Sequence, residues 1–330
     1  MSYKAEKDKI ERKIRIIKIV LLCILLAVLV GLCIFSAFCP PSTWKYHVRK
    51  PKIEERQEGE LRMHFLDVGQ GESILIELPD GKVALIDGGD WLESTATTVL
   101  RYMNALNIDE IDYLVASHAD ADHVGGLTRV VECKKVVNAY LPTVNAANAG
   151  ERYAAFYAAL TEENCAKWQS SREISLSGDG YVFEFLYPYS IDVGEETETD
   201  DNALSSVLWL DYKGVSALFT GDAPTATEDI LMRDDRLGVF THRNVDLQST
   251  EILKVAHHGG KGSTALSFLQ YLQVKTAVVS CAENNPYGHP SQEVRDHLAA
   301  VNAELYRTDE RGSIMITISA DGTYKVDCIS

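Results

Sequence analysis

The chain has 330 residues, of which 46% are hydrophobic and 24% are charged, with nine prolines and 22 glycines. This composition excludes collagen-like proteins, wholly disordered chains and small disulfide-rich scaffolds. The net charge of −16 is uneven: residues 1–60 carry 12 basic and seven acidic side chains, which leaves 20 basic against 41 acidic residues beyond them. Because broad binding to nucleic acid depends on Lys and Arg, this acidic surface argues against an unassisted grip on DNA or RNA.

An uncharged segment of 20 residues, 19–38, lies between two basic flanks. Its length suits a helix that crosses a hydrocarbon core of about 30 Å, and it lacks the polar stripe of an ordinary amphipathic helix. We therefore predict a membrane-spanning helix at 19–38, a basic cytoplasmic tail over 1–18 and a linker over 39–60. A cleaved signal peptide is the alternative, but its basic region would be unusually long and the segment ends without a clean cleavage site.

Basic residues are more numerous before the predicted span than after it, with seven on the N-terminal side and five on the other. By the positive-inside tendency, we expect the N-terminus in the cytoplasm and the chain after Pro40 outside the cell. The lipid bilayer is then one partner of this single-pass chain. Of the seven cysteines, three lie in or beside the span and the others form no CxxC pair, so no disulfide partner and no zinc knuckle are predicted.

Residues 61–330 alternate short apolar runs with amphipathic segments and contain no internal repeat, which indicates one domain. Three strands are expected first, at 61–66, 73–78 and 83–86, and they are expected to be antiparallel because a Pro-Asp-Gly turn joins the last two. Further strands are predicted at 113–117, 136–140, 181–187, 206–211, 215–220, 251–256 and 277–280. Helices are predicted at 93–106, 126–131, 225–233, 264–272 and 291–301. An α/β fold of two mixed sheets between helices satisfies this order. The acidic run 195–201 is expected to be a solvated loop.

Four side chains of metal-binding type fall within six residues at the end of the predicted strand 113–117. They belong to the segment His118-Ala119-Asp120-Ala121-Asp122-His123. Imidazole and carboxylate groups are ligands of zinc and manganese, and alternate positions on a tight strand-to-helix loop can face two different ions. An acid-rich helix N-cap would explain one aspartate but not the two histidines. The segment therefore predicts a metal site.

The segment HADADHVGGL resembles the HxHxDH motif of the metallo-β-lactamase fold, in the HxDxDH variant of the hydrolase domain of the ComEC family of competence proteins. Six further motifs occur in the ComEC-like order between residues 61 and 325: FLDVGQGES, LIDGG, LFTGD, KVAHHG, YGHP and YRTD. The resemblance implies an αββα sandwich and a metal-dependent hydrolase that acts on phosphodiesters, with DNA as the family's substrate. A single span replaces the membrane channel of ComEC, so DNA transport is not carried over.

The resemblance also implies a set of ligands for two ions. His118 and Asp120 would hold the first ion, Asp122, His123 and one member of the 257–258 histidine pair the second, and Asp222 would bridge them. We expect His257 on the metal and His258 toward the substrate, although the residues themselves leave the order open. Asp87 ends an apolar strand before two glycines, and in this fold such an aspartate orients the ligand loop from behind.

One histidine of the parent fold has no counterpart, because none of the nine histidines lies between His123 and Asp222. The ComEC-like pattern has an NxxS segment in this interval, which Asn202-Ala203-Leu204-Ser205 matches. Asn202 or the neighbouring Asp201 is therefore the candidate to reach the first ion or its water. An oxygen-rich first site would favour Mn²⁺ more than a three-histidine zinc site does. The cofactors expected are two divalent ions, Zn²⁺ or Mn²⁺.

Two close divalent ions activate water at neutral pH and neutralise charge on both sides of an in-line phosphoryl displacement, which indicates phosphodiester hydrolysis. Asp122, His258 and His289 are the expected catalytic residues. His289, in a Tyr-Gly-His-Pro turn, would donate a proton or contact the phosphate, or would only be hydrogen-bonded within the turn. Lys261 and the following Ser263 and Thr264 would contact a phosphate oxygen, or the hydroxyls would only cap the next helix.

Three functions are therefore weighed. The first is an extracellular, membrane-anchored dinuclear metallohydrolase that cleaves phosphodiesters, with DNA as the substrate implied by the resemblance. The second is a cell-envelope phosphodiesterase acting on teichoic-acid or phosphorylcholine groups; the acidic charge and the lack of a basic stripe interleaved with aromatics favour it. The third is a scaffold that keeps the fold without catalysis, which the missing histidine favours. The HxDxDH variant resembles the nucleic-acid branch, so hydrolysis of β-lactams is not expected.

Overall fold

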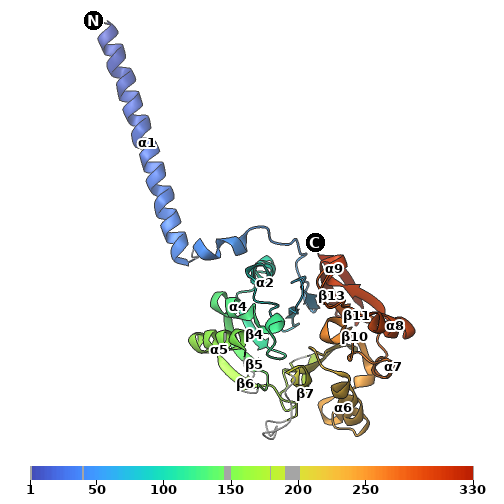
Figure 1. Ribbon diagram of the computed structural model, residues 1–330. Helices are drawn as coiled ribbons and strands as arrows, with labels where there is room; N and C mark the ends of the chain where they lie inside the picture. Colours follow the sequence, from blue (N-terminus) through green and yellow to red (C-terminus); the bar gives the residue numbers. More distant parts are fainter. Residues whose placement is uncertain (1, 39–40, 145–149, 179, 190–200, 330) are drawn as a thin grey trace. The chain divides into compact units, whose positions relative to one another are not determined.

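The structure is a computed structural model that describes residues 2–38, 41–144, 150–178, 180–189 and 201–329. The chain divides into two compact units, Met1–Val48 and Arg49–Ser330. Figure 1 shows both units, the second of which carries all the strands named below.

The first unit consists of helix α1 (Ser2–Phe38) and the short 3-10 helix η1 (Pro41–His47). Within α1, residues Glu6–Ser36 are long and apolar enough to cross a membrane by length and composition. The helix begins well before the predicted span because the basic tail is rich in helix-forming Lys, Arg, Glu and Ala and contains no proline or glycine. Such a helix is compatible with a membrane anchor.

The linker expected over residues 39–60 is shorter in the structure, because the chain from Arg49 onward belongs to the globular unit. The Lys50 ammonium group donates to the carbonyl oxygen of Asn104 at 2.8 Å, and the Arg56 guanidinium lies 3.8 Å from the Glu77 carboxylate. These contacts hold the second half of the expected linker on the surface of the domain.

Two mixed β-sheets form the centre of the globular unit. In the part of the chain that is described, the eight-stranded sheet has the order β14 (Tyr324–Ile329), β13 (Ser313–Ile318), β1 (Leu61–Phe65), β2 (Ile74–Glu77), β3 (Val83–Ile86), β4 (Glu110–Val115), β5 (Lys135–Leu141) and β6 (Ala166–Gln169). The second sheet has the order β12 (Glu304–Arg307), β11 (Thr276–Val279), β10 (Thr250–Lys254), β9 (Val215–Phe219), β8 (Val207–Tyr212) and β7 (Tyr181–Tyr187). Strands β1 to β3 are antiparallel, as predicted, and β3 to β6 are parallel.

Helices cover the outer face of each sheet, as Figure 1 shows. On the first sheet they are α2 (Glu93–Ala105), α4 (Leu127–Cys133) and α5 (Glu151–Glu163), and on the second they are α6 (Thr225–Arg236), α7 (Leu266–Leu272) and α8 (Gln292–Ala300). Shorter elements are α3 (Ala121–Val124), η2 (Asp201–Leu204), η3 (Thr241–Arg243), η4 (Leu247–Ser249), η5 (Ala256–Gly259) and α9 (Thr308–Arg311). The predicted α/β sandwich of two mixed sheets is confirmed.

The hydrophobic core lies between the two sheets. Phe65 of β1 stacks on Phe219 of β9 with ring centroids 6.3 Å apart, and Phe183 of β7 meets the same ring edge-on. All three side chains are fully or almost fully buried, and burial of one such side chain stabilises the fold by roughly 1.5–3 kcal/mol. The core therefore fixes the two sheets against each other, and the packed sheets support the loops at the strand ends.

The sequence missed several elements: α5, β6, and the three strands β12, β13 and β14. Strand β6 is mostly exposed and β14 alternates irregularly, so neither has the apolar run or strict alternation that predicts a strand. The acidic run predicted as a loop lies outside the described residues up to position 200, and Asp201 begins the 3-10 helix η2.

Candidate metal centre

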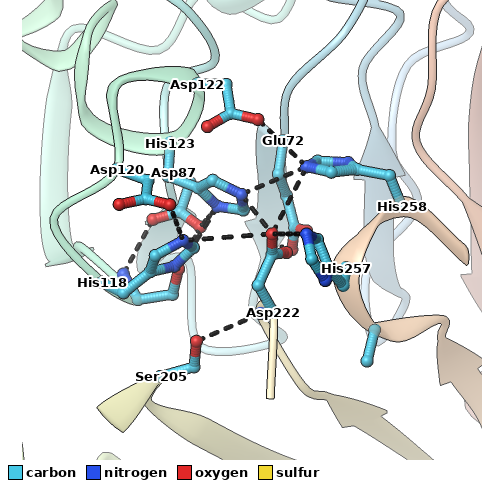
Figure 2. A network of polar contacts seen from close by, with 12 residues as sticks. Glu72, Asp87, His118, Asp120, Asp122, His123, Ser205, Asp222, His257 and His258 are labelled. Carbon is cyan, nitrogen blue, oxygen red and sulfur yellow. Dashed lines mark hydrogen bonds and ion pairs between the residues drawn. The ribbon is translucent and has the colours of Figure 1, made fainter. Parts of the chain in front are cut away.

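Four strand ends converge on one cluster of histidine and aspartate side chains. Asp87 follows β3, the segment 118–123 follows β4, Asp222 follows β9, and the pair 257–258 follows β10. Strands β3 and β4 are parallel neighbours in one sheet, and β9 and β10 are parallel neighbours in the other, so their carboxyl ends face the same edge of the sandwich. Figure 2 shows the imidazoles and carboxylates pointing toward one another there.

The Asp222 carboxylate lies at the middle of this cluster and is almost fully buried. Its oxygens lie 3.3 Å from the Nε2 atom of His123, 3.7 Å from that of His258 and 4.0 Å from that of His118. The Asp122 carboxylate lies 3.3 Å from His258 Nε2, and the Asp120 carboxylate 3.6 Å from His118 Nε2. Asp222 therefore stands between two groups, one with His118 and Asp120 and the other with Asp122 and His258.

The three buried histidines have their Nδ1 atoms occupied and their Nε2 atoms directed inward. His123 Nδ1 lies 2.7 Å from an Asp87 carboxylate oxygen, and His258 Nδ1 lies 2.8 Å from the carbonyl oxygen of Ser280. Because both partners are acceptors, each Nδ1 must donate a proton, which leaves Nε2 to bind a cation. His118 Nδ1 lies 3.0 Å from the Ser117 hydroxyl oxygen, which is free to accept because that hydroxyl donates to Asp87.

The donor set fits divalent metal ions. The ligand atoms of His118, His123 and Asp222 lie within 4.8 Å of one another, and so do those of Asp122, His123 and His258. His118 Nε2 and one oxygen of Asp222 are buried without a hydrogen-bond partner, which is costly unless a cation satisfies them. Imidazole nitrogen mixed with carboxylate oxygen is chemistry that suits zinc and manganese.

The charges of the cluster also suit a cation. Burial raises the pKa of Asp222, but the neighbouring His123 and His258 outweigh it and hold that pKa well below the usual range. Burial also raises the pKa of Asp122, but the hydrogen bond from His258 and the charge of His123 outweigh burial, so this pKa is lowered. Burial lowers the pKa of His123, yet Asp222 and Asp87 raise it well above the usual value, so a metal ion that binds Nε2 must displace a proton from that atom. The carboxylates are therefore ionised, as metal ligands must be.

Asp87 holds the ligand loop from behind. Besides the His123 ring, its carboxylate accepts from the backbone N–H of Ser117 at 2.8 Å and from the Ser117 hydroxyl at 2.6 Å. Asp87 itself has a positive φ of 58°, a conformation that is costly outside glycine. The backbone at Asp87 is therefore strained, and in this conformation the carboxylate contacts both Ser117 and His123 of the loop.

We expect Asp87→Asn to weaken metal binding by roughly 10–100-fold, because a neutral amide no longer fixes the His123 ring and lowers its basicity. The measurement is the Kd for Mn²⁺ and Zn²⁺ by titration calorimetry. Asp321→Asn, which changes an exposed turn aspartate, is the matched control and should bind like the unsubstituted chain. Equal affinity in the Asp87 variant would refute this role.

The histidine pair departs from the predicted order. His258 is 1% exposed and faces Asp122 and Asp222, whereas the His257 side chain is 39% exposed, with its Nε2 3.8 Å from Asp222. Both residues have positive φ values, 50° and 52°, so two successive side chains leave the same turn in different directions. The geometry points to His258, rather than His257, as the metal-facing member of the pair.

Three other predicted site residues, His289, Asn202 and Lys261, lie outside this cluster of ligand atoms. His289 lies beside His257, with ring centroids 5.6 Å apart, and its backbone is held by two hydrogen bonds with the Asn285 side chain. Burial, then His257 and His258, lower the pKa of His289. Asn202 lies in η2, where its carbonyl accepts from the Ser205 backbone, and Lys261 is exposed on the turn after the histidine pair.

Of the two hydroxyls that the sequence left as phosphate contacts or helix caps, that of Ser263 has hydrogen-bond partners in the described structure and that of Thr264 has none. Ser263 is buried and donates to the carbonyls of Ala256 and Gly260, so it braces the histidine turn. The start of α7 is satisfied by Glu228 of α6, whose carboxylate accepts from the backbone N–H groups of Thr264 and Ala265. Neither hydroxyl caps α7.

Sequence reasoning assigned no role to two supporting serines and did not find one buried ion pair. The Ser205 hydroxyl accepts from the Asp222 backbone N–H at 3.1 Å, and Ser117 links Asp87 to His118. Below the cluster, Lys254 of β10 pairs with Glu72, and both side chains are 0% exposed. Glu72 also lies within 4.8 Å of the ligand atoms of Asp87 and His123, so the Lys254 ammonium supplies the positive charge that this third group needs.

The backbone of Glu72 ties the first sheet to the ligand loop. Its N–H donates to the carbonyl of Asp122 at 3.1 Å, and its carbonyl accepts from Gly89 at 2.7 Å. Gly71 is required beside it, because a Cβ atom there would lie 2.6 Å from the Asp122 carbonyl oxygen, and its φ is 149°. The FLDVGQGES motif thus supports the ligand loop through its main chain.

The family assignment follows from comparison with known proteins. The profile of the metallo-beta-lactamase superfamily matches residues 66–283, so the chain belongs to that superfamily. Within it, the chain is related to competence proteins of the ComEC family. The chain is 31% identical over 272 residues to ComE operon protein 3 of Bacillus subtilis, a match that covers 78% of this chain and 33% of that protein. It is 30% identical over 270 residues to competence protein ComA of Neisseria gonorrhoeae, covering 80% and 33%.

The chain therefore spans about a third of the length of the curated relatives it matches. Among solved structures, it is similar to the metallo-beta-lactamase fold protein YhfI from Bacillus subtilis, at 9% identity and a TM-score of 0.45, covering 74% of this chain and 95% of that chain.

Proposed function

We propose that the chain is a membrane-anchored dinuclear metallophosphodiesterase that cleaves DNA. The observation that carries this proposal is the convergence of three oriented imidazoles and three carboxylates on one buried centre, with Asp222 between two groups of ligands. Its relatedness to competence proteins supports DNA as the substrate class.

In this proposal His118 and Asp120 would hold one divalent ion, Asp122, His123 and His258 would hold the other, and Asp222, which lies between the two groups, would serve both. When bound, the two ions supply an activated water and neutralise charge on the phosphate. The chain's own residues do the rest. Asp87, Ser117 and Ser280 fix the rings, and Ser205 fixes the Asp222 backbone.

His257 and His289 form the side of the site that faces solvent. The His257 side chain is partly exposed. The Nδ1 atom of His289 is buried and has no hydrogen-bond partner, and the Tyr287 ring stacks on the His289 ring. The His289 ring can donate a hydrogen bond from an imidazole N–H to a phosphate oxygen or to the leaving group. Loss of the imidazole in His289→Ala should lower kcat more than it raises KM; an unchanged kcat would refute a catalytic role.

We also propose that α1 anchors the chain with its N-terminus in the cytoplasm, so that hydrolysis takes place outside the cell. The seven basic residues before the span, against five after it, support this orientation. Protease added to intact cells should degrade the domain, and protection of the domain would contradict the orientation.

A second candidate function is favoured by charge. Beyond residue 60 the chain carries 20 basic and 41 acidic residues, a poor surface for gripping a long polyanion. A cell-envelope phosphodiesterase that acts on teichoic-acid or phosphorylcholine groups would need less cationic surface.

One assay separates these functions. The full chain in detergent, supplied with Mn²⁺ or Zn²⁺, is tested against single-stranded DNA and against bis(p-nitrophenyl) phosphate. We expect both to be hydrolysed, and Asp122→Asn to abolish both activities while the far-UV circular dichroism is unchanged. Hydrolysis of the small diester alone would refute the nuclease proposal. Hydrolysis of neither, with metal bound, would favour a scaffold.

A further inference from the structure

An exposed groove of about 480 Å³ lies between α5 and β6, outside the metal centre. It is lined by Tyr153 and Tyr157 of α5 and by Lys167 and Trp168 of β6, and we call it the aromatic groove. The Trp168 side chain is 53% exposed and that of Tyr157 is 46% exposed. Phe156, the neighbour of Tyr157 on α5, is buried and packs this helix onto the domain. Large aromatic faces that remain open on a rigid support indicate a binding surface.

The aromatic side chains of the groove are held in place. The Trp168 indole N–H donates to the Asn138 side-chain oxygen at 3.2 Å, which fixes the ring while its faces stay accessible. Tyr153 and Tyr157 lie four residues apart on α5, with ring centroids separated by 6.4 Å. Fixed flat rings lose little conformational entropy when a flat ligand stacks on them.

The groove lies at the same edge of the sheet as the metal centre. Strands β3 to β6 are parallel, so the end of β4, which leads to His118, and the end of β6, at Gln169, face the same side. Figure 1 shows β4, β5 and β6 in succession with α5 beside them. Since neighbouring strands are about 4.8 Å apart, the ends of β4 and β6 are separated by about 10 Å, a distance that a short stretch of extended polymer covers.

A stacked cation links the two places. The Arg152 guanidinium lies 4.2 Å from the centre of the Trp91 ring, and Trp91 is 53% exposed. The backbone of Trp91 packs against Gly125, at the end of the ligand loop, since a Cβ atom on Gly125 would lie 2.4 Å from the Trp91 nitrogen. Arg152 in turn precedes Tyr153 of the groove. The Arg152 side chain therefore contacts Trp91 beside the ligand loop, and the next residue along α5, Tyr153, lines the groove.

We propose that the aromatic groove stacks the bases of a single-stranded nucleic acid next to the phosphodiester at the metal centre, with Arg152 and Lys167 contacting its phosphates. The proposal rests on the proposed function and names its substrate form. Every base has a π-face, so stacking gives affinity without sequence preference. It also explains how an acidic domain can hold a polyanion: two exposed cations provide the local positive charge, and the aromatic rings provide the affinity.

The proposal is tested by binding and by turnover in the full chain. Binding is followed by fluorescence anisotropy of a labelled twelve-residue oligothymidylate with phosphorothioate linkages, which resist hydrolysis. We expect Trp168→Ala and Tyr157→Ala each to raise the Kd at least about fivefold, the lower end of the loss of one base–aromatic stack. Trp168→Phe should restore most of the affinity. Turnover of bis(p-nitrophenyl) phosphate should be unchanged in all three, because the small diester does not reach the groove.

Leu237→Ala, which removes an exposed apolar side chain after α6, is the matched control and should bind like the unsubstituted chain. Salt gives a second readout: with about two phosphates contacted, the slope of log K against log salt should be about −1.4, and a slope steeper than about −4 would contradict the proposal.

The results separate this proposal from the proposed function. Unchanged Kd values in both alanine variants overturn the groove and leave the nuclease intact if DNA is still cleaved. Groove-dependent binding of the oligonucleotide without hydrolysis of any phosphodiester overturns the nuclease and keeps the groove. Groove-dependent binding of a glycerol-phosphate polymer, with none of the oligonucleotide, overturns the assignment to nucleic acid.

Discussion

Asp222→Asn is expected to lower phosphodiester turnover by roughly 10³-fold in kcat, measured with bis(p-nitrophenyl) phosphate and Mn²⁺. The carboxylate lies between the Nε2 atoms of His123 at 3.3 Å, His258 at 3.7 Å and His118 at 4.0 Å. A neutral amide in this place removes a negative charge shared by both halves of the site. Charge stabilisation by bound ions amounts to several kcal/mol, and each 1.36 kcal/mol corresponds to a tenfold change in rate.

The matched control is Asp229→Asn, because Asp229 is an exposed aspartate on the following helix α6. It should retain the activity of the unsubstituted chain. Asn and Asp have nearly the same shape, and the Ser205 hydroxyl contacts the backbone of Asp222 rather than its carboxylate, so the fold should survive. Turnover within tenfold of the unsubstituted chain would show that Asp222 does not join two ion sites.

Lys254→Met is expected to lower the free energy of unfolding of the domain by about 3–5 kcal/mol, measured by urea denaturation of the full chain in detergent. Lys254 and Glu72 are both 0% exposed, so removal of the ammonium leaves a buried carboxylate without its counter-charge. That carboxylate lies close to Asp87, a second buried carboxylate, and the two would then repel each other. The effect should reach the ligand loop, because the Glu72 backbone donates to the Asp122 carbonyl.

Two further variants separate charge from packing. Lys275 forms a more exposed ion pair with Glu251, a residue of β10 like Lys254. Lys275→Met removes the cation of that pair and should lower the free energy of unfolding by at most about 1 kcal/mol. The double variant Glu72→Leu/Lys254→Met replaces the buried pair with apolar side chains, so it should recover most of the stability lost in Lys254→Met. If Lys254→Met unfolds at the same urea concentration as the unsubstituted chain, the pair is not a structural support.

Most of the candidate site could be predicted from the sequence, because the motifs that carry its residues lie directly after predicted strands. His118, Asp222 and the pair 257–258 each follow an apolar run, and the carboxyl ends of parallel strands meet at a common edge. The order within the histidine pair could not be deduced, because it depends on two successive positive φ values. Two identical residues in succession show no pattern that predicts these positive φ values.

Other features depend on contacts between distant segments. Lys254 stands within the apolar run of β10, and this break in the pattern was a signal that a buried partner exists, although nothing in the sequence identifies Glu72 as that partner. The aromatic groove joins α5 to the mostly exposed strand β6, and neither segment was predicted. The sequence therefore shows no single stripe of basic and aromatic residues, because the side chains of the groove come from separate segments.

Whether the chain holds a dinuclear metal centre is decided by its metal content, measured on the full chain by inductively coupled plasma mass spectrometry after titration with Mn²⁺ or Zn²⁺ and removal of excess ions. Because Asp222 lies between two groups of ligand atoms, we expect close to two ions per chain, and fewer than two in Asp222→Asn. A chain that binds neither ion, while its fold is intact, would contradict a dinuclear centre.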